Sequence, residues 1–195
     1  MRRMMWVTAI MGVVMTALVV AQGGGRPPSP AGSSATQIGA QWIDITYGRP
    51  IKRGRDLWGS GADYGKLVLA GAPVWRAGAN NTTTLKNEMP LVINGKTIAP
   101  GEYSVLIDLK PNAWTLILTT WPAQKTYNPN NTTELWGGFN YQPGKDVVRA
   151  PMTLTTLPFS VDQLAWNFVD ITNAGGKLAV MWDKQMAATA FTVGK

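Results

Sequence analysis

The feature that most constrains the fold is a series of short alternating segments, separated by turn residues, that runs through the chain after residue 40. In the segment 42–47, apolar and polar side chains alternate, as in a strand that buries one face. Asn94-Gly95 stands between the short segments 91–93 and 96–98, which is the strongest short-range signal for a β-hairpin. About nine strands at roughly ten-residue spacing predict an all-β fold, an antiparallel β-sandwich or jelly-roll-like domain, for residues 41–195.

An uncharged, largely apolar run, Met4–Ala21, precedes this domain. Its 18 residues exceed a signal-peptide core of about 7–15 residues and reach the length of a spanning helix, about 17–25 residues. Arg2 and Arg3 place the N-terminus on the cytoplasmic side, and Trp6 stands where an interfacial aromatic side chain would lie. We therefore expect residues 4–21 to cross the lipid bilayer of the inner membrane once, as a transmembrane helix with a periplasmic domain behind it.

The same segment also fits a cleaved signal peptide. A small-residue cleavage site ends at Ala21, and cleavage there would leave a periplasmic or secreted protein. The next stretch, residues 22–40, is rich in glycine, proline and serine and predicts a flexible linker. The expected organisation is an anchor or signal at 1–21, a linker at 22–40 and a periplasmic β domain at 41–195.

Cysteine and histidine are both absent from the 195 residues. Their absence excludes disulfides, thiolate metal sites, cysteine nucleophiles, Ser-His-Asp triads and histidine-ligated metals or haem. We therefore assign no catalytic, cofactor or metal residues and expect a protein that is not an enzyme. The net charge is +7, but the cations are scattered except for one cluster at residues 49–55. They form no basic helix or nucleic-acid-binding motif, so no nucleic-acid partner is expected.

Two motifs, "YGRPIKRGRDLWG" at 47–59 and "VWRAGANNTT" at 74–83, carry a family resemblance. Together they resemble a bacterial family of exported proteins of unknown function, whose signature reads Tyr-x-Arg-Pro, then Gly-Arg, then Trp-Arg-x-Gly-Ala-Asn. The resemblance continues through "GKTIAPGEYSVLI", "WGGFNY" and "LAWNFVDI". It implies a single β-sandwich-like domain beyond the inner membrane and implies no activity.

The chain departs from the family pattern at two places. An apolar insertion, Leu67–Pro73, separates the "YGK" motif from "VWR", and Asn81 stands where relatives have a glutamate. If that glutamate is a metal ligand or a base in relatives, this protein has lost it. An apolar insertion on a sandwich fits a contact surface better than a catalytic device, so Leu67, Val68 and Leu69 are candidate interaction residues.

The signature around Trp75 and Arg76 has two interpretations. In the functional one, the arginine fork, the aromatic face and Asn80 bind an anion or a sugar. In the structural one, which we favour, Arg76 is buried and paired with an acid such as Asp44 or Asp63.

A basic cluster follows the predicted strand 42–47. It comprises Arg49, Lys52, Arg53 and Arg55. The cluster fits docking to an acidic partner surface and fits a solvated loop equally well.

Several aromatic residues flank the long loop "PAQKTYNPNNTTEL". If Trp121, Tyr127 and Trp136 were exposed there, they would suit carbohydrate stacking or a protein interface. Alternatively, the two tryptophans pin the loop to the core, which is the interpretation we favour.

These observations predict a non-catalytic, membrane-anchored accessory subunit, whose periplasmic domain packs on other subunits of a larger bacterial membrane complex, for example photosynthetic or respiratory. The alternative is a periplasmic or secreted module that binds glycans or cell-wall material through Trp75, Arg76, Trp121 and Trp136. A third possibility, a carboxylate-dependent hydrolase, would need two acids facing one cleft.

Overall fold

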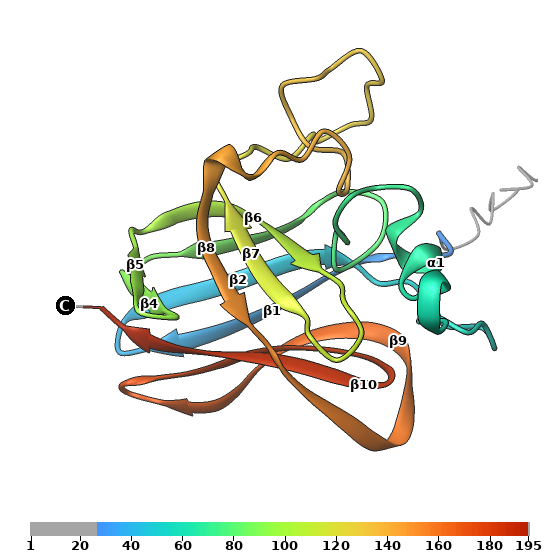
Figure 1. Cartoon of the computed structure of the whole chain (residues 1–195). Coiled ribbons are helices and arrows are strands. Elements are labelled where there is room, and N and C mark those ends of the chain that lie inside the picture. The colour runs from blue at the N-terminus through green and yellow to red at the C-terminus, as the bar shows by residue number, and fades with distance from the viewer. Residues whose placement is uncertain (1–26, 195) are drawn as a thin grey trace, which may run out of the picture.

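Every pair of neighbouring strands is antiparallel in the computed structural model, which describes residues 27–194 (Figure 1). One sheet has the order β1-β2-β3-β6-β7-β8 and the other the order β5-β4-β10-β9. The strands are β1 Ala31–Ile38, β2 Gln41–Gly48, β3 Thr83–Asn87, β4 Leu91–Ile93, β5 Lys96–Ile98, β6 Gly101–Asp108, β7 Thr115–Thr119, β8 Asp146–Pro151, β9 Thr153–Thr172 and β10 Gly175–Val193. The all-β prediction is therefore confirmed. Trp6 and the predicted anchor or signal at 1–21 lie outside the described residues.

Helical segments in the described chain are short. They are α1 Lys66–Leu69 and two 3-10 turns, Gly61–Asp63 and Pro143–Lys145. Among residues 27–194, no helix combines the length and the apolar character that a membrane crossing requires.

One apolar core joins the two sheets. Ile43 and Ile45 of β2 are buried in it, as the alternation of segment 42–47 predicts. Leu178 and Val180 of β10 enter the same core from the other sheet. Each such side chain contributes about 1.5–3 kcal/mol on burial, so contact between the sheets is the main source of stability.

A second, smaller apolar cluster lies on the other face of the six-stranded sheet. Leu106 of β6 and Ile117 of β7 pack there against Leu135. Figure 1 shows the long connection between β7 and β8 rising over this end of the sheet. The connection is therefore attached to the sheet through Leu135, and part of it stands away from the sheet.

The predicted linker extends too far. Residues 31–38 form β1, which pairs with β2 from Ala31↔Gly48 to Ile38↔Gln41. The serine, threonine and alanine side chains of β1 carry little apolar contrast, so the pattern of β1 alone does not reveal a strand. Its order comes from the hydrogen bonds to β2, and the folded domain begins before residue 41.

Four tryptophans meet at one end of the core. Trp75 is stacked on Trp182 at a centroid distance of 6.2 Å and an interplanar angle of 11°. Trp58 lies 4.7 Å from Trp114 and 5.6 Å from Trp75. Trp75 exchanges two backbone hydrogen bonds of 2.8 Å with Ile107 of β6, whereas Trp182 lies on β10. The tryptophan cluster therefore ties the two sheets together.

Candidate functional site

A hollow of about 210 Å³ lies beside α1, close to the start of the described chain, and collects many of the predicted interaction residues. The loop after β2, the α1 segment, the loop before β3 and strand β10 all contribute to it. We call it the arginine hollow, and its lining includes Arg55, Leu67, Val68, Arg76, Asn80 and Trp182. Two arginines, an asparagine, two tryptophans and aliphatic residues thus line one site.

Arg76 is the half-buried cation of the arginine hollow. Its Nη1 donates a 2.6 Å hydrogen bond to the backbone oxygen of Asn80, and its guanidinium packs over the Cα of Gly137. No carboxylate of the described residues forms an ion pair with it, so the predicted pairing with Asp44 or Asp63 is wrong. Burial lowers the pKa of Arg76, but a guanidinium remains charged at neutral pH. A partly desolvated charge without a protein counter-ion favours an anionic ligand.

Arg55 supplies the second cation. Its Nε donates to the backbone oxygen of Lys52 at 2.9 Å and its Nη2 to that of Ile51 at 2.7 Å. Its Cζ lies 6.0 Å from the ring centroid of Trp182, at the outer limit of a cation–π contact. Two backbone bonds therefore hold the Arg55 side chain at the mouth of the hollow.

The insertion supplies the apolar rim. Leu67 is 48% exposed at the surface, whereas Leu69 packs against the core and Val68 both lines the hollow and packs against the core. Trp75 is only 1% exposed, so it forms the floor of the hollow rather than an open stacking face. An occupant would contact Leu67 and Val68 beside the two arginines.

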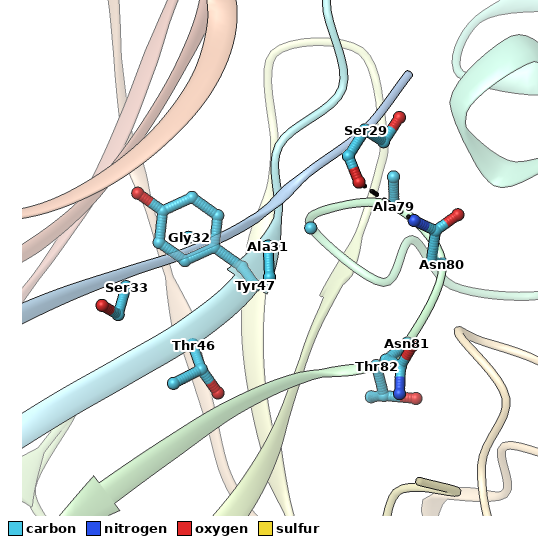
Figure 2. A pocket seen from close by; sticks show the side chains of 11 residues that line it. Ser29, Ala31, Gly32, Ser33, Thr46, Tyr47, Ala79, Asn80, Asn81 and Thr82 are labelled. Carbon is cyan, nitrogen blue, oxygen red and sulfur yellow. Dashed lines mark hydrogen bonds between the residues drawn. The ribbon is translucent and has the colours of Figure 1, made fainter. Parts of the chain in front are cut away.

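Asn80 separates the arginine hollow from a larger depression of about 530 Å³. Its Nδ2 donates to the backbone oxygen of Ser29 at 3.1 Å, and this bond ties the start of the described chain to the loop before β3 (Figure 2). On the far side of the bond, Thr46, Tyr47 and Thr82 line the depression together with small residues (Figure 2). None of residues 27–194 that line this depression is charged, so the two hollows differ in chemistry.

Two of the four residues of the predicted basic cluster are bonded to distant parts of the fold. Lys52 forms a 2.6 Å ion pair with Asp183, and Arg49 Nε donates to the backbone oxygen of Leu164 at 3.4 Å. Arg53 is exposed and does not line the arginine hollow. Arg53 and Arg55 share the lining of an adjacent hollow of about 300 Å³, and Arg55 is the one member of the cluster that also lines the arginine hollow.

The aromatic residues of the long loop separate into two groups. Trp121 packs against the smaller apolar cluster, and Lys145 Nζ lies 3.9 Å from its ring centroid. Tyr127 and Trp136 belong to neither apolar cluster and lie 5.3 Å apart at the surface. The predicted pinning role therefore fits Trp121 and does not fit Trp136.

Asn81, the departure from the family pattern, has a structural role. Its Nδ2 donates to the backbone oxygens of Gln124 at 3.4 Å and Lys125 at 3.0 Å. A glutamate at this position could not donate these bonds. Asn81 thus joins the loop before β3 to the long loop.

Two contributors to the arginine hollow are not predicted by the sequence pattern. Trp182 and Ser29 lie far from the signature in the sequence, and only the pairing of distant strands brings them to it. The alternation around Trp182 predicts that its side chain faces inward, but it does not predict which residues it meets.

No aspartate or glutamate of the part of the chain that the structure describes lines the arginine hollow or the neighbouring depression. Among the described residues, no group of three or more acidic side chains is placed to hold a metal ion. The arrangement can hold an anion next to an apolar group, and it offers no carboxylate pair for acid–base work in these hollows.

Comparison with protein families matches residues 29–191 to the family described as a protein of unknown function, DUF2911. The match covers most of the chain, and the chain therefore belongs to this family, in agreement with the resemblance seen in its motifs. The match begins at Ser29, ahead of β1, which agrees with β1 being part of the domain. Neither the curated proteins nor the solved structures give a match to the chain.

Proposed function

We propose that this member of the DUF2911 family is a non-catalytic accessory subunit that docks an acidic segment of a partner protein in the arginine hollow. The observation that carries the proposal is the half-buried guanidinium of Arg76, which has no carboxylate partner among residues 27–194. A carboxylate supplied by a partner would pair with it in a fork geometry that arginine suits.

The rest of the lining narrows the chemistry of the partner. Arg55 adds a second positive charge, while Leu67 and Val68 offer aliphatic surface next to it. The occupant that matches both is a peptide segment in which an aspartate or glutamate neighbours an apolar side chain. Rim charges of this kind raise the association rate and fix the register of a complex.

In this proposal the two sheets form a periplasmic β-sandwich that the segment 4–21 anchors in the inner membrane. Seven residues, 22–28, separate that segment from Ser29, and they span at most about 25 Å when extended. The arginine hollow includes Ser29, so it would stay close to the membrane surface. The partner is then a subunit of a larger bacterial membrane complex, of the photosynthetic or respiratory kind.

The docking proposal is tested by site-specific photocrosslinking in the native host. A benzophenone amino acid replaces Leu67 in the full-length chain, and mass spectrometry identifies the crosslinked peptide. We expect one protein adduct, joined to a segment that contains aspartate or glutamate. Arg55→Gln reduces its yield at least fivefold, whereas Arg53→Gln, two residues away and outside the hollow, leaves it unchanged.

Three outcomes would overturn the proposal: no adduct at Leu67, an adduct on a segment without acidic residues, or equal yields from Arg55→Gln and Arg53→Gln. Adding 0.5 M salt gives an independent check. The crosslink yield should fall, because salt screens an exposed contact that depends on charge.

The anchoring part is tested separately, by mass spectrometry of the native N-terminus and fractionation of cells. A chain that retains residues 4–21 in the membrane fraction supports the anchor. A mature protein that starts at Gln22 and is released on osmotic shock supports the alternative, a periplasmic or secreted domain cleaved after Ala21.

A further inference from the structure

A second hollow, of about 340 Å³, lies on the long connection between β7 and β8. Three aromatic side chains and several amides surround it. We call it the aromatic hollow, and its lining includes Gln124, Tyr127, Asn128, Trp136, Phe139 and Asn140. Its volume is at the lower end of the range for ligand sites, about 300–1,000 Å³.

The aromatic rings of this hollow do not serve the core. Tyr127 is 57% exposed and Phe139 is 39% exposed, and neither residue belongs to an apolar cluster of the described chain, nor does Trp136. Tyr127 and Trp136 lie 5.3 Å apart with their planes inclined by 47°. At this distance the two rings contact each other and form one aromatic surface. Trp136 is half-buried, and folding alone gives no reason to keep the rings of Tyr127 and Phe139 exposed beside it.

The loop that carries the rings is fixed in position. Gln124 is only 2% exposed, and its Nε2 donates to the backbone oxygens of Asn131 at 3.1 Å and Glu134 at 3.4 Å. Its Oε1 accepts a 2.9 Å bond from the backbone N–H of Asn128. Thr82 Oγ1 donates to the backbone oxygen of Gly137 at 2.9 Å and secures the other side of the loop. The rings are thus held in place before a ligand binds, which lowers the entropy cost of binding.

The remaining polar atoms are neutral hydrogen-bonding groups. Asn140 donates through Nδ2 to the backbone, which leaves its Oδ1 without a partner among residues 27–194. Asn128 accepts through Oδ1, which leaves its Nδ2 likewise open within the described chain. The described residues that line the hollow include no charged side chain. The site therefore offers aromatic faces, one open acceptor and one open donor to an uncharged ligand.

We propose that the aromatic hollow binds a neutral saccharide unit. A pyranose ring presents C–H groups on its faces and hydroxyl groups at its edge. The C–H groups fit the electron-rich faces of Tyr127, Trp136 and Phe139, and the hydroxyl groups match the open amide atoms of Asn128 and Asn140. A protein interface of this size would bury more apolar surface and would not need a concave, amide-lined centre.

The test is isothermal titration of the full-length chain in lauryldimethylamine oxide, a detergent without a sugar headgroup. The probes are maltohexaose, cellohexaose and chitohexaose. We expect at least one of the three to bind with a dissociation constant below 1 mM, and Tyr127→Ala and Phe139→Ala each to weaken that binding at least tenfold. Trp42→Ala is the control. Trp42 of β2 is 44% exposed but lies outside the hollow. Its replacement should leave saccharide binding unchanged.

The proposal is overturned if none of the three probes binds below 1 mM. The proposal is equally overturned if saccharide binding persists in the Tyr127→Ala, Phe139→Ala double variant. It is also overturned if Trp42→Ala weakens binding as much as the substitutions in the hollow do. A protein adduct from a photocrosslinker at Tyr127, without saccharide binding, would assign the hollow to a protein interface. Near-ultraviolet circular dichroism of each variant separates loss of the site from loss of the fold.

Discussion

At the scale of single residues, Gly137 determines where the guanidinium of Arg76 lies. Its backbone has φ of +63°, in the left-handed region that glycine adopts at little cost. A Cβ at this position would overlap Cζ of Arg76 and would come within 2.6 Å of Nε. The close packing of the arginine on the loop therefore depends on the missing side chain.

Gly137→Ala should displace the Arg76 guanidinium and strain the backbone together. We expect the free energy of unfolding in urea to fall by about 1–2 kcal/mol, and the crosslink from Leu67 to decrease. Gly39→Ala is the matched control, because Gly39 has φ of +62° and a Cβ added there would meet no atom within 4 Å. It should lose similar stability while keeping the crosslink, and an equal loss of crosslinking in both variants would contradict the role of Gly137.

The ion pair between Lys52 and Asp183 makes stability depend on pH. Burial by itself raises the pKa of Asp183, but hydrogen bonds from Lys52 Nζ and Ser160 Oγ, with the charge of Lys52, outweigh it and lower the pKa. Because the folded-state pKa is below the unfolded one, about 3.9, the stabilisation is present above that value. It is lost as the pH falls through the lowered pKa.

Asp183→Asn should therefore lower the free energy of unfolding at pH 6 and change it much less at pH 2. Asp170→Asn is the matched control, since Asp170 also has a positive φ but its ion pair with Lys177 is exposed. Exposed pairs contribute about 0–1 kcal/mol, so this variant should show a smaller effect at pH 6. Urea unfolding at both pH values measures the difference, and a gap between wild type and Asp183→Asn that is constant from pH 2 to 6 would refute the linkage.

At the scale of elements, the long loop between β7 and β8 is organised by a buried amide. Gln124→Leu removes three hydrogen bonds to backbone groups and leaves those groups to find water. We expect faster amide hydrogen exchange across residues 124–135, while β6 and β7 keep their protection. Hydrogen exchange with mass spectrometry measures this, with Gln142→Ala, an exposed residue of the same loop, as the control. Uniform loss of protection in β6 and β7 would show that Gln124 supports the whole domain instead.

Strands with clear apolar contrast are predictable from the sequence, and strands without it are not. The hairpin at Asn94-Gly95 forms as predicted, with Ile93 opposite Lys96. The composition of β1 predicts a linker because small and polar residues make up most of it. It is a strand because it pairs with β2 along its whole length. Pairing between distant segments is a property of the whole chain, which a local pattern does not contain.

The candidate site is also predictable only in part, because local patterns do not show which distant segments meet. The signature places Arg76 and Asn80 within one loop, and the structure brings both to the arginine hollow. Trp121 and Trp136 carry the same local signal, yet only Trp121 packs against an apolar cluster. Both flank the same loop over one face of the sheet, so the difference lies in how each side chain packs, and that is decided by the tertiary structure.

At the scale of the whole molecule, the tryptophan cluster connects stability to the arginine hollow. Trp75 is bonded to β6 and Trp182 belongs to β10, so their stacked rings join the two sheets. Both also line the hollow. An occupant that packs on this floor binds the folded chain and not the unfolded one, so its binding should raise the stability of the whole domain.

A double-mutant cycle tests whether the stacked pair couples the sheets. Trp75→Leu and Trp182→Leu should each destabilise the protein, and the double variant should lose less than the two separate effects combined, by about 0.5–1.5 kcal/mol. Trp42 lies outside the cluster, so Trp42→Leu combined with Trp182→Leu should be additive within about 0.3–0.5 kcal/mol. Urea unfolding followed by far-ultraviolet circular dichroism measures all five variants. Additivity in the first cycle would mean that the contact between Trp75 and Trp182 does not couple the two sheets, and that the floor of the hollow is independent of their association.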